Sequence, residues 1–172
     1  MIQDKLLNVK YTDIDYSVLS DAGLSVLKGG SPFDRITYRY SPIYAWLYIP
    51  NHILTIHFAK FLMIFFDYLI AKALSKLLKR NAKSDYIILF AWWLNPLSFA
   101  ISTRGSSDGI PILAFLLSLL ALKFNRFGLS GMALGFSTHL KPNAIIYAPT
   151  IALAIDLIRP SRKSNRRRKT SN

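Results

Sequence analysis

Apolar residues gather in the second part of the chain, in stretches long enough to predict helices. These stretches lie at about 53–74, 86–102, 108–122 and 127–158, and the last can form two short helices broken at Pro142. They are too crowded, and too poorly balanced by polar faces, to close around one water-soluble core. The pattern therefore predicts an all-α fold, a polytopic integral membrane protein with about four to five spanning helices.

The first part of the chain is hydrophilic and has no apolar run of spanning length. Apolar residues recur in it at three- and four-residue spacing, which predicts a short amphipathic helix lying along the membrane surface. Gly29, Gly30 and Pro32 follow and are expected to end that helix. The apolar positions are Val18, Leu19, Ala22, Val26 and Leu27.

Composition agrees with a lipid environment. Hydrophobic residues make up 52% of the chain and the mean hydropathy is +0.27. The absence of cysteine excludes disulfides, thiolate zinc sites and cysteine nucleophiles. A net charge of +13 would suggest nucleic acid in a soluble protein. We expect no nucleic acid here, because no aromatic residue accompanies the basic tail, and such a tail after a last span favours anionic lipid.

Basic and potentially functional loops alternate along the chain, which predicts the topology. The positive-inside rule places the basic clusters in the cytosol and the first forty or so residues, the Arg104 loop and the His139 loop on the lumenal or exterior face. We therefore expect a lumenal loop at 1–50, a transmembrane bundle at 51–158 and a disordered cytosolic tail at 159–172. The basic clusters are Lys72, Lys76, Lys79, Arg80 and Lys83; Lys123 and Arg126; and Arg159, Arg162, Lys163, Arg166, Arg167, Arg168 and Lys169.

Two carboxylates, Asp13 and Asp15, lie two residues apart just before the predicted surface helix. Acids at this position often cap a helix and face the positive end of its dipole. Alternatively, one of them acts as a general base whose pKa is tuned near the membrane. A metal role is weakly supported, since two acids without further ligands seldom make a site. Asp67 lies within a predicted span and should have a partner inside the bundle.

Several cations could hold an anionic group on the same face. Arg39 is flanked by tyrosines and is either an interfacial anchor or a phosphate ligand. Arg104 follows a span interrupted at Pro96, and His139 and Lys141 lie at a helix end, where simple solvation is the alternative to headgroup binding. His52 and His57 are expected to be interfacial or packed rather than metal ligands.

Taken in order, five motifs resemble the GPI mannosyltransferase 1 family, whose members add the first mannose to the glycosylphosphatidylinositol precursor. The resemblance runs from about Leu6 to His139, and no single motif would be specific. The motifs are Val9-Lys10-Tyr11-Thr12-Asp13-Ile14-Asp15-Tyr16; Gly30-Ser31-Pro32; Tyr38-Arg39-Tyr40-Ser41-Pro42 with Ala45-Trp46-Leu47; Leu94-Asn95-Pro96; and Ser102-Thr103-Arg104-Gly105.

The resemblance implies a GT-C-like helical bundle in the endoplasmic reticulum membrane. It implies an inverting transfer of an α1,4-linked mannose from dolichyl phosphate mannose to glucosaminyl (acyl)phosphatidylinositol, with a small accessory membrane subunit. We expect no metal or cofactor, because the leaving group is a phosphate and the sequence shows no fuller cluster of metal ligands. Asp13 would be the base and Asp15 a supporting contact. A phosphate leaving group needs no protonation, so one base is sufficient. The phosphate contacts would be Arg39, Arg104, His139 and Lys141.

Departures from the family pattern predict a fragment or short form. The chain begins almost at the aspartate motif, reads Pro142-Asn143-Ala144 after the His-x-Lys motif, and reads Arg104-Gly105-Ser106-Ser107-Asp108 where the family tends to have Arg-Gly-Asn-Ala followed by an acid. A basic tail replaces the expected C-terminal spans. The alternative function is therefore an inactive, truncated accessory protein or fragment, and a transporter is the least favoured.

Overall fold

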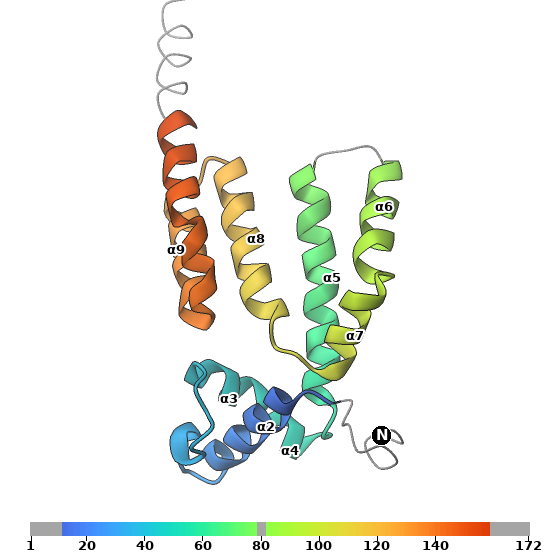
Figure 1. Cartoon of the computed structure of the whole chain (residues 1–172), viewed down its shortest axis with the longest axis vertical. Helices are drawn as coiled ribbons and strands as arrows, with labels where there is room; N and C mark the ends of the chain where they lie inside the picture. The colour runs from blue at the N-terminus through green and yellow to red at the C-terminus, as the bar shows by residue number, and fades with distance from the viewer. Residues whose placement is uncertain (1–11, 79–81, 159–172) are drawn as a thin grey trace, which may run out of the picture.

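The computed structural model describes residues 12–78 and 82–158. Long helices lie side by side in a helical layer, and shorter N-terminal helices pack across one end of it (Figure 1). The described residues form helices joined by turns and loops and contain no strand, which confirms the all-α prediction. The predicted basic tail at 159–172 lies outside the described residues, as do Lys79 and Arg80.

Residues 12–57 form an N-terminal unit of short helices. The unit contains α2 (Ile14–Leu27), the 3-10 helix η1 (Pro32–Asp34), α3 (Pro42–Tyr48) and α4 (Pro50–Ile53). Proline stands at the start of the last three, where its missing N–H costs nothing. Gly29 follows α2 with φ of +82°, the left-handed conformation that glycine adopts without strain. The helix predicted at this position is confirmed.

The apolar stripe of α2 is covered by protein rather than presented to a membrane surface. Leu19 and Ala22 are fully buried, and the stripe packs on α3, where Ala45 and Tyr48 are also fully buried. A Cβ added at Gly23 would lie 3.0 Å from the Tyr48 carbonyl carbon, so the two backbones approach closely. The spacing of apolar residues thus predicted the helix but not that α3 covers its apolar stripe, and the position of this helix along a membrane surface stays a prediction.

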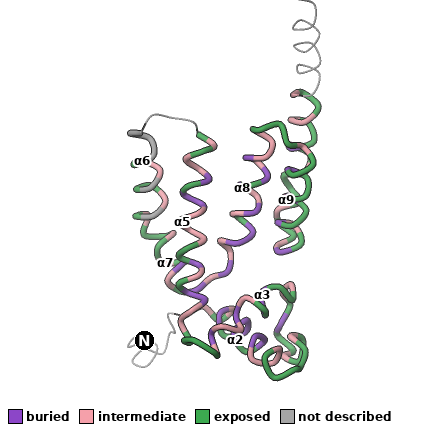
Figure 2. The backbone as a smooth tube through the Cα atoms, turned by 180° about the vertical axis from the view of Figure 1, so that it is seen from behind, coloured by how far each residue is buried: buried purple, intermediate pink, exposed green. Residues whose placement is uncertain are grey.

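The helical layer is built from paired helices. Its elements are α5 (Phe58–Leu78), α6 (Ala82–Trp93), α7 (Pro96–Arg104), α8 (Gly109–Lys123), α9 (Phe127–Leu140), the 3-10 helix η2 (Pro142–Tyr147) and the helix at 148–158. Helix α8 packs on α5 and on α9, and α5 also contacts α6 and α7. Buried residues follow the facing sides of α5 and α8 and gather in the N-terminal unit (Figure 2).

The described helices differ in length and in apolar character, the two properties that a membrane-spanning helix requires. None of them is, by itself, both long and apolar enough to cross a membrane. One pair passes together, Tyr86–Trp92 with Pro96–Arg104, bent by 57° at the break between them. The break follows from Pro96, which has no N–H to donate, and the Asn95 side chain caps α7 by accepting from the Leu97 N–H at 2.9 Å.

Helices α8 and α9 pack closely through small polar side chains. Ser118, Ser130 and Ser137 are fully buried. The Ser118 hydroxyl donates to the Ser130 carbonyl at 2.9 Å, and the Ser137 hydroxyl donates to the Pro111 carbonyl at 2.8 Å. These bonds satisfy the buried hydroxyls, and the small side chains let the helices come together.

The two ends of the helical layer differ in character. At one end the Lys123 ammonium donates to the carbonyls of Lys76 and Leu77, the latter at 2.7 Å, where a cation favours the carboxyl end of α5. The α7–α8 loop and the end of α9 lie at the opposite end, beside the N-terminal unit (Figure 1). The acidic motif, Arg104 and His139 therefore share one end, away from Lys123.

Candidate functional site

The acidic motif lies at the start of α2 and is fixed to the α7–α8 loop. Asp13 is the N-cap residue, and its carboxylate accepts weakly from the Asp15 N–H at 3.4 Å. The Asp13 N–H donates to the Arg104 carbonyl at 3.1 Å. Tyr11, the first tyrosine of the predicted motif, lies outside the described residues. The capping role is thus observed, and it leaves most of the hydrogen-bonding capacity of the carboxylate open.

A cavity of about 340 Å³ opens at this junction. Its lining consists of Thr12, Asp13, Ile14, Ser17 and Arg104. An acidic and a basic residue thus line the same space, although they come from segments far apart in the sequence. This is the pairing needed to accept a proton from one group while holding an anion on a neighbouring one.

A row of tyrosines backs the acidic motif, and sequence reasoning missed it. Tyr40, Tyr44 and Tyr48 recur at four-residue spacing, a signal that could have been read as one helix face. Tyr44 and Tyr48 are buried, and the Tyr40 and Tyr44 rings meet edge to face at 6.0 Å. Burial raises the pKa of all three phenols, and Asp15 raises that of Tyr40 further. The row therefore offers neutral donors rather than bases.

Gly105 allows the α7–α8 loop to approach this row. It has φ of +85°, and an added Cβ would lie 2.5 Å from the Tyr16 ring. The Tyr48 hydroxyl donates to the Gly105 carbonyl at 3.4 Å. Glycine at this position is thus required both by the backbone conformation and by the space available.

His139 and Lys141, at the end of α9, reach the same region and have protein partners there. The His139 Nε2 lies 3.0 Å from the Ser41 hydroxyl, which joins α9 to the N-terminal unit. The Lys141 ammonium donates to Asp108 at 2.6 Å, which joins α9 to the start of α8. Both predicted residues therefore lie at the junction, with contacts a substrate would share or displace.

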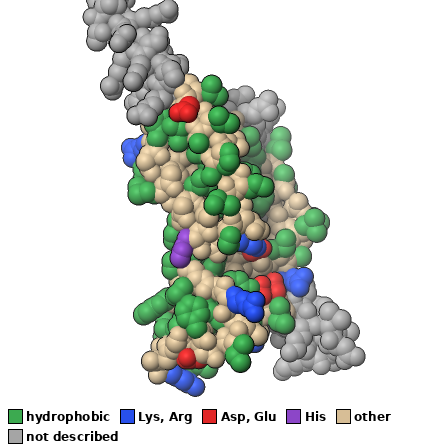
Figure 3. All heavy atoms as spheres, turned by 60° about the vertical axis from the view of Figure 1, so that its left-hand side comes forward, with side chains coloured by type: hydrophobic (Ala, Val, Ile, Leu, Met, Phe, Trp, Pro, Cys, Tyr) green, Lys and Arg blue, Asp and Glu red, His purple; other side chains and the backbone are tan. Residues whose placement is uncertain are grey.

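Lys141 and Asp108 also line an apolar groove of about 1,020 Å³. Apart from Asp108, Lys141 and a few small polar side chains, its walls are apolar, and the rings of Phe115 and Tyr147 lie 4.4 Å apart within it. Figure 3 shows hydrophobic side chains over much of the outer surface of the long helices, with several charged side chains where these helices meet the N-terminal unit. A lysine in the lining of an otherwise mainly apolar groove suits an amphiphile with an anionic head.

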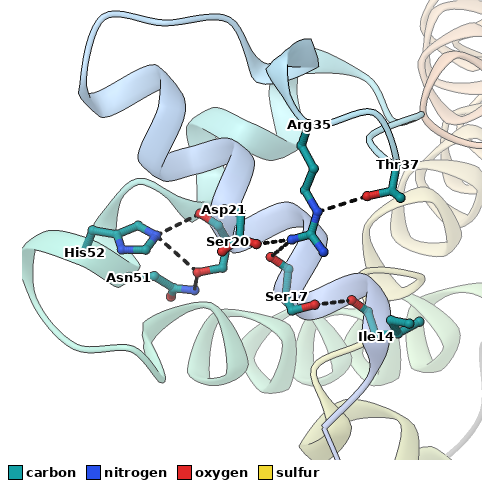
Figure 4. Close-up of polar contacts among 8 residues, drawn as sticks. All are labelled: Ile14, Ser17, Ser20, Asp21, Arg35, Thr37, Asn51 and His52. Carbon is teal, nitrogen blue, oxygen red and sulfur yellow. Dashed lines mark hydrogen bonds and ion pairs between the residues drawn. The ribbon is translucent and has the colours of Figure 1, made fainter.

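Arg39 is not brought into either cavity. It is exposed, and it forms no ion pair with the residues that the structure describes. The neighbouring Arg35 is instead the structural arginine (Figure 4): its Nε donates to Thr37 Oγ1 at 2.9 Å, its guanidinium donates to the Ser17 carbonyl at 3.1 Å, and it pairs with Asp21. No sequence signal distinguished these two arginines.

The acid inside a predicted span has a partner that the sequence did not reveal. The Ser102 hydroxyl, on α7, donates to the Asp67 carboxylate on α5. His52 is packed in the N-terminal unit, where its Nε2 lies 2.8 Å from the Ser20 carbonyl. Within 12–78 and 82–158, no three metal-binding side chains come together to form a metal site.

The fold and the site together define an all-α protein with an acid–arginine cavity and an apolar groove at one end of a helical layer. A family model described as "GPI transamidase subunit PIG-U" matches residues 12–172. The chain belongs to this family and is homologous to GPI mannosyltransferase 1. The recognition made from sequence motifs is thereby confirmed.

Similar curated proteins carry the mannosyltransferase name. GPI mannosyltransferase 1 of Eremothecium gossypii is 40% identical over 155 residues, covering 89% of this chain and 39% of the relative. That of Candida albicans is 42% identical, covering 88% and 40%, and the Danio rerio "GPI alpha-1,4-mannosyltransferase I, catalytic subunit" is 37% identical, covering 89% and 40%. The chain thus spans about two fifths of the length of these relatives. No solved structure matches it.

Proposed function

We propose that this chain carries the mannosyl-transfer site of a GPI mannosyltransferase I. The reaction adds the first, α1,4-linked mannose from dolichyl phosphate mannose to glucosaminyl (acyl)phosphatidylinositol. The observation that carries the proposal is the shared cavity of Asp13 and Arg104 in a chain about 40% identical to enzymes of this name. Neither residue alone would distinguish an enzyme from a capped helix.

Asp13 is assigned as the general base. Its carboxylate accepts the proton of the acceptor hydroxyl at C4 of glucosamine, that oxygen bonds to the anomeric carbon of mannose, and the bond from this carbon to the phosphate oxygen breaks. Dolichyl phosphate leaves with the electron pair as an anion, so no acid has to protonate it. Asp15, next to Tyr40, is assigned as a supporting contact. The reaction needs no metal or cofactor.

The donor phosphate is assigned to cations at the same end of the molecule. Arg104 lines the cavity, Lys141 lines the groove, and His139 lies in the last turn of α9, just before Lys141. The polyprenyl chain of the donor would lie along the apolar groove. Arg39 is retained as a phosphate contact only for a bound state in which it turns toward the substrate.

The proposed location is the endoplasmic reticulum membrane, with the site on the lumenal face. Its support is the separation of the Lys123 end of the helical layer from the end that holds Asp13, together with the positive-inside rule. The proposed partners are the two lipid substrates and a small accessory membrane subunit, in keeping with the word "subunit" in the name of the Danio rerio relative.

The direct test is mannosyl transfer by the 172-residue chain. Microsomes from cells that lack GPI mannosyltransferase I would be supplied with labelled dolichyl phosphate mannose after expression of wild-type chain or Asp13→Asn. We expect product with wild type and a loss of at least about 100-fold with Asp13→Asn, the scale of removing a general base. Equal transfer by both chains would remove Asp13 from the mechanism.

A second candidate is a non-catalytic membrane subunit. The observation in its favour is the family model, whose description names a transamidase subunit rather than a transferase. In that case the wild-type chain, present at normal abundance in the microsomes, would transfer no mannose. Asp13→Asn would then leave every measured property of the chain unchanged, apart from a small loss of helix stability, because Asn caps as well as Asp but lacks the negative charge that favours the positive end of the helix dipole.

A further inference from the structure

Lys60 contacts the residues that flank the acidic motif and is almost completely buried. Lys60 is only 6% exposed, although it carries an ammonium group and lies in the first turn of α5. A buried ion is costly unless polar groups or charges surround it. The placement of Lys60 therefore calls for an explanation that the reaction described above does not supply.

Two contacts tie the Lys60 ammonium to the beginning of α2. Its Nζ donates to the Thr12 hydroxyl at 3.0 Å and lies 5.1 Å from the centre of the Tyr16 ring, a cation–π distance. Thr12 lies just before Asp13 in the chain, and Tyr16 lies three residues after it in the first turn of α2. The ammonium thus holds both ends of the segment that presents the Asp13 carboxylate.

The surroundings of Lys60 also include the α7–α8 loop. The Lys60 Cγ would be 3.3 Å from a Cβ at Gly105, and Gly105 follows Arg104, whose carbonyl accepts from the Asp13 N–H. One buried side chain thus contacts the segments that carry both sides of the cavity. Because Lys60 is not part of the cavity lining, it acts through Thr12 and Tyr16 rather than on the substrate.

We propose that Lys60 is a positioning residue that fixes the first turn of α2, and with it the Asp13 carboxylate, for transfer. The proposal rests on the proposed function for its kinetic consequence, but the fixing itself can be measured without any reaction. Small displacements of a reacting group are costly, so the contacts of Lys60 should appear in kcat rather than in substrate binding.

The variants are chosen to separate positioning from folding. Lys60→Met keeps the length of the side chain and removes the charge and the donor, while Thr12→Val removes only the hydroxyl that accepts from Lys60. Lys60→Arg keeps both a charge and donors. The matched control is Lys72→Met, because Lys72 is on the same helix and lies 5.2 Å from the Tyr68 ring in the same kind of contact, but is exposed and remote from Asp13.

The first measurement is amide hydrogen exchange of the full chain in nanodiscs. The Asp13 N–H donates to Arg104 and the Tyr16 N–H donates to the Asp13 carbonyl, so these amides report on the first turn. We expect Lys60→Met and Thr12→Val to speed exchange over 13–18 by about 10-fold, while Lys72→Met leaves it unchanged. Unchanged exchange in Lys60→Met would overturn the proposal whether or not the chain transfers mannose.

The second measurement is mannosyl transfer with both substrates varied. We expect Lys60→Met to lower kcat by about 10- to 100-fold with KM values within about twofold of wild type, and Lys60→Arg to retain more activity than Lys60→Met. Thr12→Val combined with Lys60→Met should cost no more than Lys60→Met alone, since the Thr12 contact that Thr12→Val removes is already lost in Lys60→Met. If Lys60→Met exchanges faster than wild type but keeps the kcat of wild type, the proposal is also overturned. No transfer by wild type would contradict the proposed function instead.

Discussion

Lys141 and Asp108 form an ion pair of 2.6 Å in the lining of the apolar groove, and both side chains remain close to half exposed. Lys141 is the residue after α9 and Asp108 the residue before α8, so the pair joins the C-terminal end of α9 to the start of α8. Half-exposed pairs contribute only about 0–1 kcal/mol to stability. An arriving phosphate can therefore take the place of Asp108 on the Lys141 ammonium without disrupting the fold.

This relationship predicts how Lys141 acts on the donor. Lys141→Gln should raise the KM for dolichyl phosphate mannose about 10-fold, because a charge-assisted bond to the phosphate is lost, while the fold is retained. Lys123→Gln is the control, since Lys123 contacts the carboxyl end of α5 at the opposite end of the layer. Initial rates in microsomes at several donor concentrations give both values. An unchanged KM in Lys141→Gln would exclude a phosphate contact at this residue.

The close packing around Gly105 predicts that alanine is tolerated there less well than at Gly128, where space is open. Gly105→Ala places a Cβ 2.5 Å from the Tyr16 ring at φ of +85°, and should destabilise the chain by roughly 1–3 kcal/mol. Gly128→Ala, where a Cβ meets nothing within 4 Å in helix α9, should be neutral or stabilising by up to about 1 kcal/mol. Thermal unfolding of the two purified variants measures the difference. Equal melting temperatures would contradict the close approach of the α7–α8 loop.

The hydrogen bond between Ser102 and Asp67 predicts that the loss of stability in Ser102→Ala depends on the Asp67 carboxylate. Ser102→Ala should destabilise the chain by roughly 1–3 kcal/mol, because the Asp67 carboxylate loses a donor from α7 in a partly buried position. In an Asp67→Asn background the same substitution should cost less. Ser98→Ala, one turn earlier on α7, is the control. A cost of Ser102→Ala that is the same in both backgrounds would mean that the hydroxyl matters for another reason.

The sequence predicted helices well where a periodic pattern and a terminating residue coincide. Helix α2 ends shortly before Gly29 and α7 begins at Pro96 after a break, because left-handed φ and a missing N–H are properties of single residues. The sequence could not say that α3 covers α2, because both present apolar faces that fit lipid or protein equally well. Only tertiary packing decides between these partners.

For the site, the sequence predicted which residues carry chemistry but could not say which of them meet. Asp13 and Arg104 share a cavity, whereas Arg39 stays outside it, and nothing in their local motifs distinguishes the two arginines. Lys60 was missed because a lysine at the start of an apolar stretch looks like an interfacial anchor. Its role depends on contacts with Thr12, which is 48 residues away in the chain.

The buried tyrosine row predicts a loss of stability at high pH. Burial is the main reason that the pKa of Tyr48 is raised, with smaller contributions from Tyr16 and Tyr44. A raised pKa in the folded state means that its contribution to stability is complete below the ordinary phenol pKa of about 10 and is lost as the pH rises above it. Helicity by circular dichroism and tyrosinate absorbance, followed together from about pH 9 to pH 12, should show phenol ionisation accompanied by loss of the N-terminal helices.

Tyr48→Phe separates this effect from general alkaline unfolding. Removing the hydroxyl removes the group that must stay neutral, so the pH midpoint of helix loss should move upward, at the cost of the bond to the Gly105 carbonyl. Tyr86→Phe is the control, because Tyr86 is 65% exposed on α6 and does not belong to the buried row. If both variants lose helicity at the wild-type pH, the buried phenol does not limit the alkaline stability of the N-terminal unit.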